Sequence, residues 1–314
     1  MGKHSVTDRR TRLAASRAYR LKGKEAPAGG IVRIAAGRAD KAVEELRGAG
    51  GDGELAEAIH SARKDLKKLR SVLRLVRADL GEERFQAENG RYREAGRRLS
   101  ASRDAEVKLE TLAALGRRFE GELPPDALDA WRAALSGEDV GLGGGGALAA
   151  QIEGAIAAIE AGRGEIDRWS LSAGSWDLLA PGIERTYRRG RGEMKRARAH
   201  PEAEAVHDWR KRVKDLWYQL RIVREAWPPV VGAMADRAHE LAELLGEHHD
   251  LALLRADLDG RRELSNREAF AAAIERRQED LLADALDLGA RVYAEKPKAF
   301  VRRLRAYWEC WRPG

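Results

Sequence analysis

The sequence contains the stretch HSARKDLKKLRSVLR at residues 60–74 and a second version of it, HDWRKRVKDLWYQLR, at residues 207–221. The second copy begins 147 residues after the first and aligns with it without a gap. Two further segments recur in the same order at nearly the same offset, Gly30–Arg33 with Gly182–Arg185 and Leu99–Asp104 with Leu245–Asp250. This pattern indicates an internal duplication, so we expect the two halves to fold as similar units.

Each copy of the repeated stretch is typical of a helix with one basic face. At 100° per residue, the cations of the first copy fall within an arc of about 120° that includes the histidine, while the leucines point the other way. Like charges at this spacing cost about 0.2–0.5 kcal/mol per pair, so a repeated face of one sign predicts an anion that offsets the repulsion. The two faces consist of His60, Arg63, Lys64, Lys67, Arg70 and Arg74 in the first copy, and of His207, Arg210, Lys211, Lys214 and Arg221 in the second, where Trp217 replaces Arg70.

The composition predicts an all-helical protein of one large duplicated domain or two domains. The 314 residues are rich in Ala, Leu, Arg and Glu, and no strand-like alternation of any length occurs. The 58 Lys and Arg exceed the 51 Asp and Glu by only seven, so the placement of the cations matters more than their total. The single Cys310 excludes an internal disulfide framework, and we find no signal peptide and no apolar run of membrane-spanning length. We therefore expect a cytoplasmic protein with no membrane partner.

Helix signals along the chain predict two four-helix bundles. Residues 1–29 are expected to form a basic flexible arm, residues 30–170 a first helical bundle and residues 171–314 a second one. The expected helices span residues 31–47, 54–80, 91–115, a stretch from 126 and 147–169, and then 202–227, a stretch around 245–250, 266–290 and 297–309. A pseudo-twofold axis between the halves would bring the two basic helix faces around one shared cavity or groove.

The paired His-x-x-Arg-Lys-x-x-Lys stretches, the Leu-x-x-x-Arg/His-Asp segments that follow them, and Tyr19-Arg20-Leu21 ahead of Gly30-Ile31-x-Arg33 resemble the CHAD family, the conserved histidine α-helical domain. The resemblance runs from about Tyr19 to Tyr307 and lacks the Glu-x-Glu-x-Lys strand of a triphosphate tunnel domain, which points to a stand-alone module. It implies two pseudosymmetric helical bundles whose basic surface binds inorganic polyphosphate, and association with polyphosphate granules. By position it implies contacts from both basic faces, with Arg33, Arg185, Arg188, Arg191, Arg103 and His249 as additional candidates.

Catalytic and metal-dependent functions find little support in the residues. His60 and His207 have no second ligand one helical turn away and lie among cations that would repel a metal. Phosphoryl transfer would need carboxylates that hold Mg²⁺ beside the basic face, and that face contains none. The glycine run at residues 141–146 lacks the strand and the Lys-Ser/Thr of a phosphate-binding loop. We therefore expect no catalytic residues, no metal and no cofactor.

The predicted function is thus non-enzymatic binding of inorganic polyphosphate, which phosphate or sulfate ions can mimic. The histidines are expected to donate hydrogen bonds to phosphate, and binding should tighten as the pH falls through about 6.5. Asp104 and Asp250 are interpreted either as partners that orient neighbouring Arg or His residues or as members of ordinary salt bridges. Two alternatives stay open, namely binding to nucleic-acid backbones and a helical adaptor for an acidic protein partner.

Overall fold

The computed structural model describes residues 18–50, 52–99, 104–136, 144–172, 175–261 and 264–312, and every regular element in these ranges is helical. The predicted all-α class is therefore confirmed. In chain order the elements are α2 (Pro27–Gly48), α3 (Asp52–Leu75), α4 (Arg77–Leu80), α5 (Glu82–Arg98), α6 (Asp104–Arg118), α7 (Pro125–Ser136), α8 (Gly144–Ile166), the 3-10 helix η1 (Trp176–Leu178), α9 (Ala180–Ala199), α10 (Ala203–Ile222), the 3-10 helix η2 (Arg224–Ala226), α11 (Pro228–Gly260), α12 (Arg267–Val292) and α13 (Pro297–Trp311).

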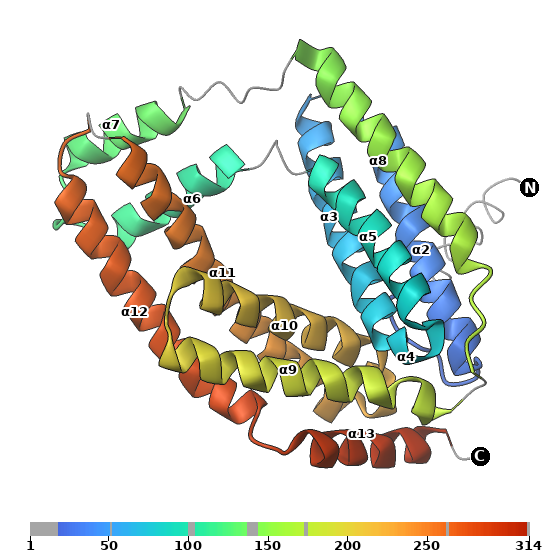
Figure 1. Cartoon of the computed structure of the whole chain (residues 1–314). Helices are drawn as coiled ribbons and strands as arrows, with labels where there is room; N and C mark the ends of the chain where they lie inside the picture. The colour runs from blue at the N-terminus through green and yellow to red at the C-terminus, as the bar shows by residue number, and fades with distance from the viewer. Residues whose placement is uncertain are drawn as a thin grey trace, which may run out of the picture.

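Eight helices form two groups that follow the duplication. In the first half, α2, α3, α5 and α8 pack on one another, and in the second half α9, α10, α11 and α12 do the same, with α13 alongside α9 (Figure 1). The groups meet where α3 contacts α9 and α10, and one hydrophobic core runs through both. The pseudo-twofold relation between the groups stays a prediction.

Helices α6 and α7 depart from the prediction that residues 30–170 form a bundle of their own. The helix expected over residues 91–115 is described as two helices, α5 from Glu82 and α6 from Asp104, whereas α11 runs unbroken for 33 residues. Both α6 and α7 lie beside the far ends of α11 and α12, away from the rest of the first half (Figure 1). There Trp131 packs on Phe270 with ring centroids 5.6 Å apart. The apolar stripe of α6 and α7 thus completes a second core with α11 and α12.

The flexible arm predicted for residues 1–29 is wrong for residues 18–29. Tyr19 and Leu21 are buried, at 9% and 0% exposure, because they pack between apolar side chains of the two motif helices. The Leu21 N–H donates to the carbonyl of Ile222 on α10 at 2.9 Å, and the Tyr19 hydroxyl donates to the carbonyl of Lys68 on α3 at 3.2 Å. Pro27 then starts α2. Residues 1–17 of the predicted arm lie outside the described residues.

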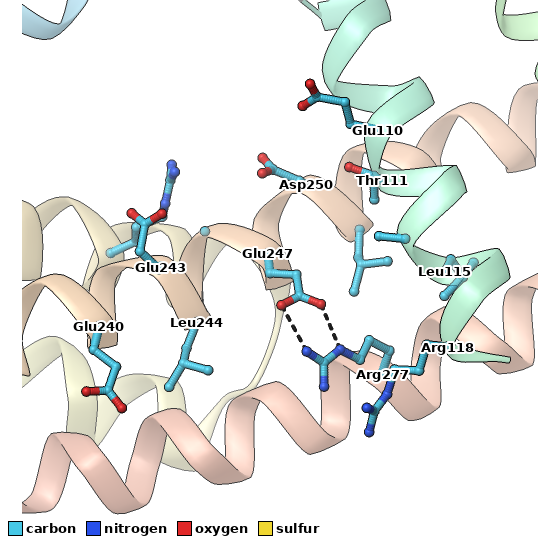
Figure 2. A pocket seen from close by; sticks show the side chains of 14 residues that line it. Glu110, Thr111, Leu115, Arg118, Glu240, Glu243, Leu244, Glu247, Asp250 and Arg277 are labelled. Carbon is cyan, nitrogen blue, oxygen red and sulfur yellow. Dashed lines mark hydrogen bonds and ion pairs between the residues drawn. The ribbon is translucent and has the colours of Figure 1, made fainter.

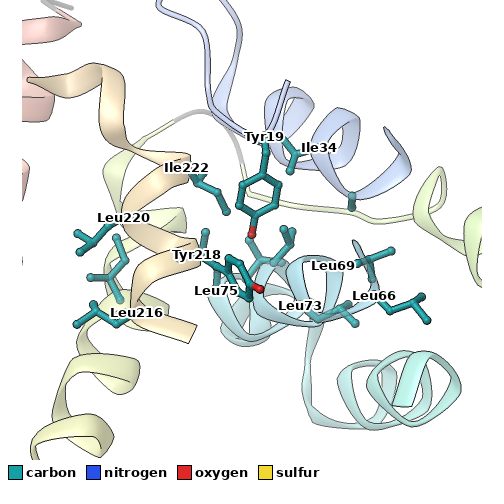
Figure 3. Close-up of a cluster of buried hydrophobic side chains, with 14 of the residues drawn as sticks. Tyr19, Ile34, Leu66, Leu69, Leu73, Leu75, Leu216, Tyr218, Leu220 and Ile222 are labelled. Carbon is teal, nitrogen blue, oxygen red and sulfur yellow. The ribbon is translucent and has the colours of Figure 1, made fainter. Parts of the chain in front are cut away.

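Burial of apolar side chains holds α3 against α10 and so positions their basic faces. Figure 3 shows Tyr19 and Tyr218 near leucines of both helices, and the two rings meet edge to face at 6.2 Å. The Ser71 hydroxyl donates to the carbonyl of Asp215 across the interface at 3.2 Å. A Cβ on Gly182 would lie 1.9 Å from the Leu75 carbonyl oxygen, so only glycine lets α9 approach α3 this closely.

Candidate functional site

Cations from the two copies of the motif meet beside each other. The pKa of Lys67 on α3 is lowered to about 8 by desolvation and then by repulsion, first from Lys214 on α10 and next from Arg63, Arg210 and Arg70. The pKa of Lys214 is likewise lowered to about 8, by desolvation and then by repulsion from Arg210 and, more weakly, from Lys64. The duplicated faces therefore act on one another. We name this set the central basic cluster, which consists of Arg63, Lys64, Lys67 and Arg70 on α3, His207, Arg210, Lys211 and Lys214 on α10, and His249 on α11.

The central basic cluster stays accessible to a ligand from solution. Lys67 is exposed and Lys214 is half-buried, so water still reaches both ammonium groups. Protein atoms packed around these groups remove part of their hydration, and this desolvation lowers both pKa values. At Lys67, repulsion by four other cations adds to this loss of water. An anion bound here would remove this repulsion and return the lysines to their ordinary charged state.

Two histidine rings lie against each other, with their planes tilted by 31°, at the α11 side of the cluster. The rings of His207 and His249 lie 4.1 Å apart. Desolvation and then the charges of Lys211 and Arg210 lower the pKa of His207, and desolvation followed by His207 lowers that of His249 to about 4. Both rings are therefore mostly neutral at pH 7 in the free protein. His207 Nδ1 and Arg210 Nε are buried without a hydrogen-bond partner among the described residues, so both polar atoms are left unsatisfied.

Carboxylates from other helices lie next to the cluster, although the basic faces of the motif contain none. Glu243 and Asp250 of α11 act on the Lys214 ammonium, where they raise its pKa and offset part of the lowering. Together with Arg210 they line an open pocket of about 440 Å³, and Glu110 of α6 lines it from the opposite side (Figure 2). The motif could not reveal these carboxylates, because they come from helices other than the motif helices. In the ranges that the structure describes, no three acidic, His or Cys side chains are grouped to hold a metal.

Arg74 leaves the basic face for a buried ion pair between the two copies. Its guanidinium lies 3.1 Å from a carboxylate oxygen of Asp215 on α10, whose other oxygen lies 3.1 Å from Arg212. Asp215 is only 6% exposed, so these cations neutralise a buried charge. Arg70 lies close by, and its Nε donates to Asn89 on α5 at 3.0 Å. The motif therefore supplies structural arginines as well as those of the central basic cluster.

Arg221 and Arg33 lie at the N-terminal segment instead of in the cluster. The Arg221 guanidinium lies 5.6 Å from the ring centre of Tyr19 and 5.5 Å from that of Trp217. Arg33 pairs with Glu25 at 2.6 Å and donates to the carbonyls of residues 18 and 20 at 3.0 and 2.8 Å. Arg33 thus fixes the segment that carries Tyr19, and we leave it out of the proposed site.

The remaining candidates are dispersed. Arg185 lies near Arg77 and Glu82, which act on its pKa, at the end of α3. Arg188 pairs with Glu184 at 2.6 Å and, with Arg191, lines a separate cavity between α9 and α13. His60 is half-buried on α3. Arg103 lies outside the described residues.

Comparisons with known proteins place the chain in a family. The sequence matches the CHAD domain family over residues 33–259, which is more than half of the chain, so the protein belongs to this family. Its structure is similar to the crystal structure of the CHAD domain from the plant Ricinus communis, with a TM-score of 0.51 and 18% identity over 94% of this chain and 95% of the other. Among curated proteins, none matches the sequence significantly. The similarity to the plant domain supports the fold, and the family match confirms the resemblance seen in the motifs.

Several residues around the site could not be found from the motif. Asp215 and Arg212 stand within the second copy, yet only the packing of α10 on α3 shows that they meet Arg74. Glu243 follows Lys214 by 29 residues, and no local pattern links the two. A signal was available for Lys195, which follows Arg191 at helical spacing on the same face of α9.

Proposed function

We propose that this protein binds inorganic polyphosphate, without turning it over, through the central basic cluster. The observation that supports the proposal is that cations from different copies of the motif lower the pKa values of one another: Lys214 acts on Lys67, and Lys64 acts on Lys214. Sites that oppose stability in this way are typical of function, since the folded protein stores a repulsion that only a ligand relieves.

The chemistry of the cluster suits a chain of phosphates. Polyphosphate carries about one negative charge per phosphate and presents no base to read, so a row of cations is sufficient to recognise it. Arginines pair with phosphate oxygens through two parallel hydrogen bonds, while lysines act as adaptable point charges. Each charge-assisted hydrogen bond contributes about 1.5–3 kcal/mol, which exceeds the repulsion between neighbouring cations.

Membership in the CHAD family adds independent support, because some members of the family bind polyphosphate. We extend the proposal to recruitment of the protein to polyphosphate granules in the cytoplasm. No helix of the described ranges has both the length and the apolar character needed to cross a bilayer.

Nucleic acid is the main competitor for such a surface. Proteins that bind single strands place aromatic rings where bases can stack on them. Tyr218 is buried, and Trp217 already stacks on His239 with ring centroids 4.0 Å apart. The aromatic residues of α10 are thus engaged within the protein, which favours a ligand without bases.

The test is a calorimetric titration of the purified protein with long-chain polyphosphate and, separately, with single- and double-stranded DNA of matched charge, at physiological salt and at several times that concentration. We expect polyphosphate binding to persist at a salt concentration that abolishes DNA binding. Charge reversal at Arg63, Lys67, Arg210 and Lys214 should abolish it. Equal affinities with identical salt dependence would contradict the proposal and favour a general polyanion surface. Incubation with polyphosphate and Mg²⁺ should leave the chain length unchanged.

A further inference from the structure

A second basic cavity lies between α9 and α13. It has a volume of about 700 Å³ and is lined by Glu184, Arg188, Arg191, Gly192 and Lys195 of α9 and by Lys296, Pro297 and Lys298 at the start of α13. Five of these eight residues are cations and one is a carboxylate. Figure 1 shows α13 running beside α9 at this place. The cavity therefore combines two segments that are about 100 residues apart in the sequence.

Most of the cations in this cavity have no ion-pair partner within the part of the chain that the structure describes. Glu184 is paired with Arg188 at 2.6 Å and so neutralises one of the five. Arg191, Lys195, Lys296 and Lys298 form no ion pair with any carboxylate of the described residues. Many of the other arginines in the described ranges do have such a partner, for example Arg303 with Glu295 next to the cavity. The unpaired charges indicate a counter-ion that comes from solution.

The cavity is built rigidly, because the chain before α13 is fastened to α9. The Tyr187 hydroxyl donates to the carbonyls of Val292 and Glu295 at 3.2 and 3.4 Å, and its ring stacks on Phe300 at 4.0 Å. A Cβ on Gly190 would lie 2.2 Å from the Tyr293 hydroxyl, so glycine allows this close approach. Lys296 and Lys298 are therefore held opposite the α9 cations before any ligand arrives, which lowers the cost of ordering them on binding.

The second cavity is distinct from the central basic cluster. The charges that act on Lys67, Lys214 and His207 come from α3, α10 and α11, and none comes from the residues that line this cavity. On α9, Arg188, Arg191 and Lys195 share one face, whereas Arg185 and Arg189 lie about 100° away around the helix and act on Arg77 and Arg74. A ligand in the cavity would thus not touch the central basic cluster.

We propose that the α9–α13 cavity is a second, independent phosphate-chain site, which makes the protein bivalent for polyphosphate. The inference rests on the proposed function. It adds that one long polyphosphate chain occupies both sites, or that one protein joins two polyphosphate chains. Binding at the second site is then intramolecular for a long chain, so its effective concentration is high and the overall affinity exceeds that of either site. A protein of this kind would crosslink polyphosphate instead of merely coating it.

The test compares three variants of the full-length chain by calorimetry, with tripolyphosphate as the short probe and long-chain polyphosphate as the long one. The cavity variant is Arg191→Glu with Lys298→Glu, and the cluster variant is Lys67→Glu with Lys214→Glu. The matched control is Arg117→Glu with Arg132→Glu, which makes the same change in net charge at exposed positions of α6 and α7. We expect the cavity variant to bind one tripolyphosphate fewer than the wild type and to bind the long chain about ten- to a hundredfold more weakly.

The outcomes separate this inference from the proposed function. If the cavity variant keeps the stoichiometry and the long-chain affinity of the control, the second site does not exist, while the proposed function stands. If the wild type binds neither probe, both are wrong. Because charge reversals can disturb folding, a neutral cavity variant, Lys195→Gln with Lys296→Gln, is measured as well. It should show a smaller loss of long-chain affinity than the charge-reversal variant. Light scattering should show that long chains crosslink the wild type and the control but neither site variant.

Discussion

The two copies of the motif, α3 and α10, share one sequence pattern but have different surroundings. On α3, Lys67 faces the other copy, and the buried Asp65 pairs with Arg38 and Lys68 at 3.1 and 2.7 Å. On α10, the His207 ring contacts that of His249 on α11, and the buried Asp215 pairs with Arg74 from the opposite copy. The two copies therefore share a basic face and an apolar face, but their side chains pair with different residues.

The buried ion pairs make the difference concrete. Asp65 and Lys68 occupy the positions that correspond to Arg212 and Asp215, so the pair is present in both copies with its charges exchanged. The carboxylate of the first copy, Asp65, forms ion pairs with Arg38 and Lys41 of α2, whereas that of the second copy, Asp215, forms one with α3. Exchange of the charges lets each copy meet a different neighbour while both basic faces stay cationic.

The largest effect is expected where the two copies meet. Replacing Lys67 and Lys214 together by Glu should weaken binding at the central basic cluster by about 10²–10⁴-fold, because two charge-assisted contacts of about 1.5–3 kcal/mol each are lost. If one anion bridges the two copies, the single changes Lys67→Ala and Lys214→Ala should weaken binding by similar factors. Calorimetry with tripolyphosphate would measure all three, and a loss confined to one lysine would show that only one copy binds.

The next largest effect concerns stability and separates the two buried carboxylates. Asp65→Asn should lower the free energy of unfolding by about 3 kcal/mol, because the fully buried carboxylate of Asp65 lies within 4 Å of three cations that would lose their counter-charge. Asp215→Asn should cost less, since two arginines are involved and the site is slightly more open. Urea unfolding would measure both. A larger loss for Asp215 would mean that the interface between the copies is the more tightly coupled.

The stabilisation that Asp65 provides should depend on pH. Burial alone would raise the pKa of Asp65, but Lys68, Arg38 and Lys41 outweigh it and the pKa is lowered from 3.8. The stabilisation is therefore complete above the unfolded-state pKa of about 4 and is lost as the pH falls through the lowered folded-state value. The gap in stability between the wild type and Asp65→Asn should close in that acidic range.

Sequence patterns could predict the helices and the basic faces because both depend on local spacing. The apolar stripe of Leu66, Leu69 and Leu73 alone indicates which side of α3 is buried, and all three are buried. What packs against what depends on distant residues. The docking of α6 and α7 on α11 and α12 depends on a fit such as that of Trp131 to Phe270, which has no local signature.

The candidate site shows the same division. The duplicated motif predicted that the two basic faces lie around one shared cavity or groove, and in the structure Lys214 of one face acts on Lys67 of the other. It did not predict that Arg33 would hold the N-terminal segment or that Arg74 would pair with Asp215, because a cation on a helix face looks the same whether its partner is a ligand or a distant carboxylate.

A smaller effect is expected from pH on binding. Because Lys67 and Lys214 have a pKa of about 8 in the free protein and a bound anion raises it, binding takes up protons at and above that pH. Affinity should therefore be full below about pH 7 and fall as the pH rises through 8, by about tenfold per lysine one unit above the free-state pKa. Titrations in buffers of different ionisation enthalpy would count the protons. Lys67→Arg, which stays charged, should remove about half of the dependence.

The histidines should add a separate and more acidic phase. The expected tightening through pH 6.5 moves to lower pH, because the free-state pKa of His207 is lowered and that of His249 is about 4. Binding that strengthens between pH 6 and 5 in the wild type but not in His207→Gln would place the imidazole at the ligand. An identical profile in both proteins would remove it from the site.

The smallest effect is expected at the position where the copies differ most in sequence. Trp217 occupies the place of Arg70, yet it stacks on His239 and lies beside Arg221, on the side of Tyr19. Trp217→Arg should therefore change polyphosphate affinity by less than about threefold, because the new cation adds repulsion with both Lys214 and Arg221 at helical spacing, which offsets its attraction for the anion. It should lower the melting temperature by a few degrees through the lost stacking, which is worth about 0.5–1.5 kcal/mol. If affinity rose tenfold instead, the ligand would extend along α10 as far as residue 217, and the two copies would bind more alike than their present surroundings indicate.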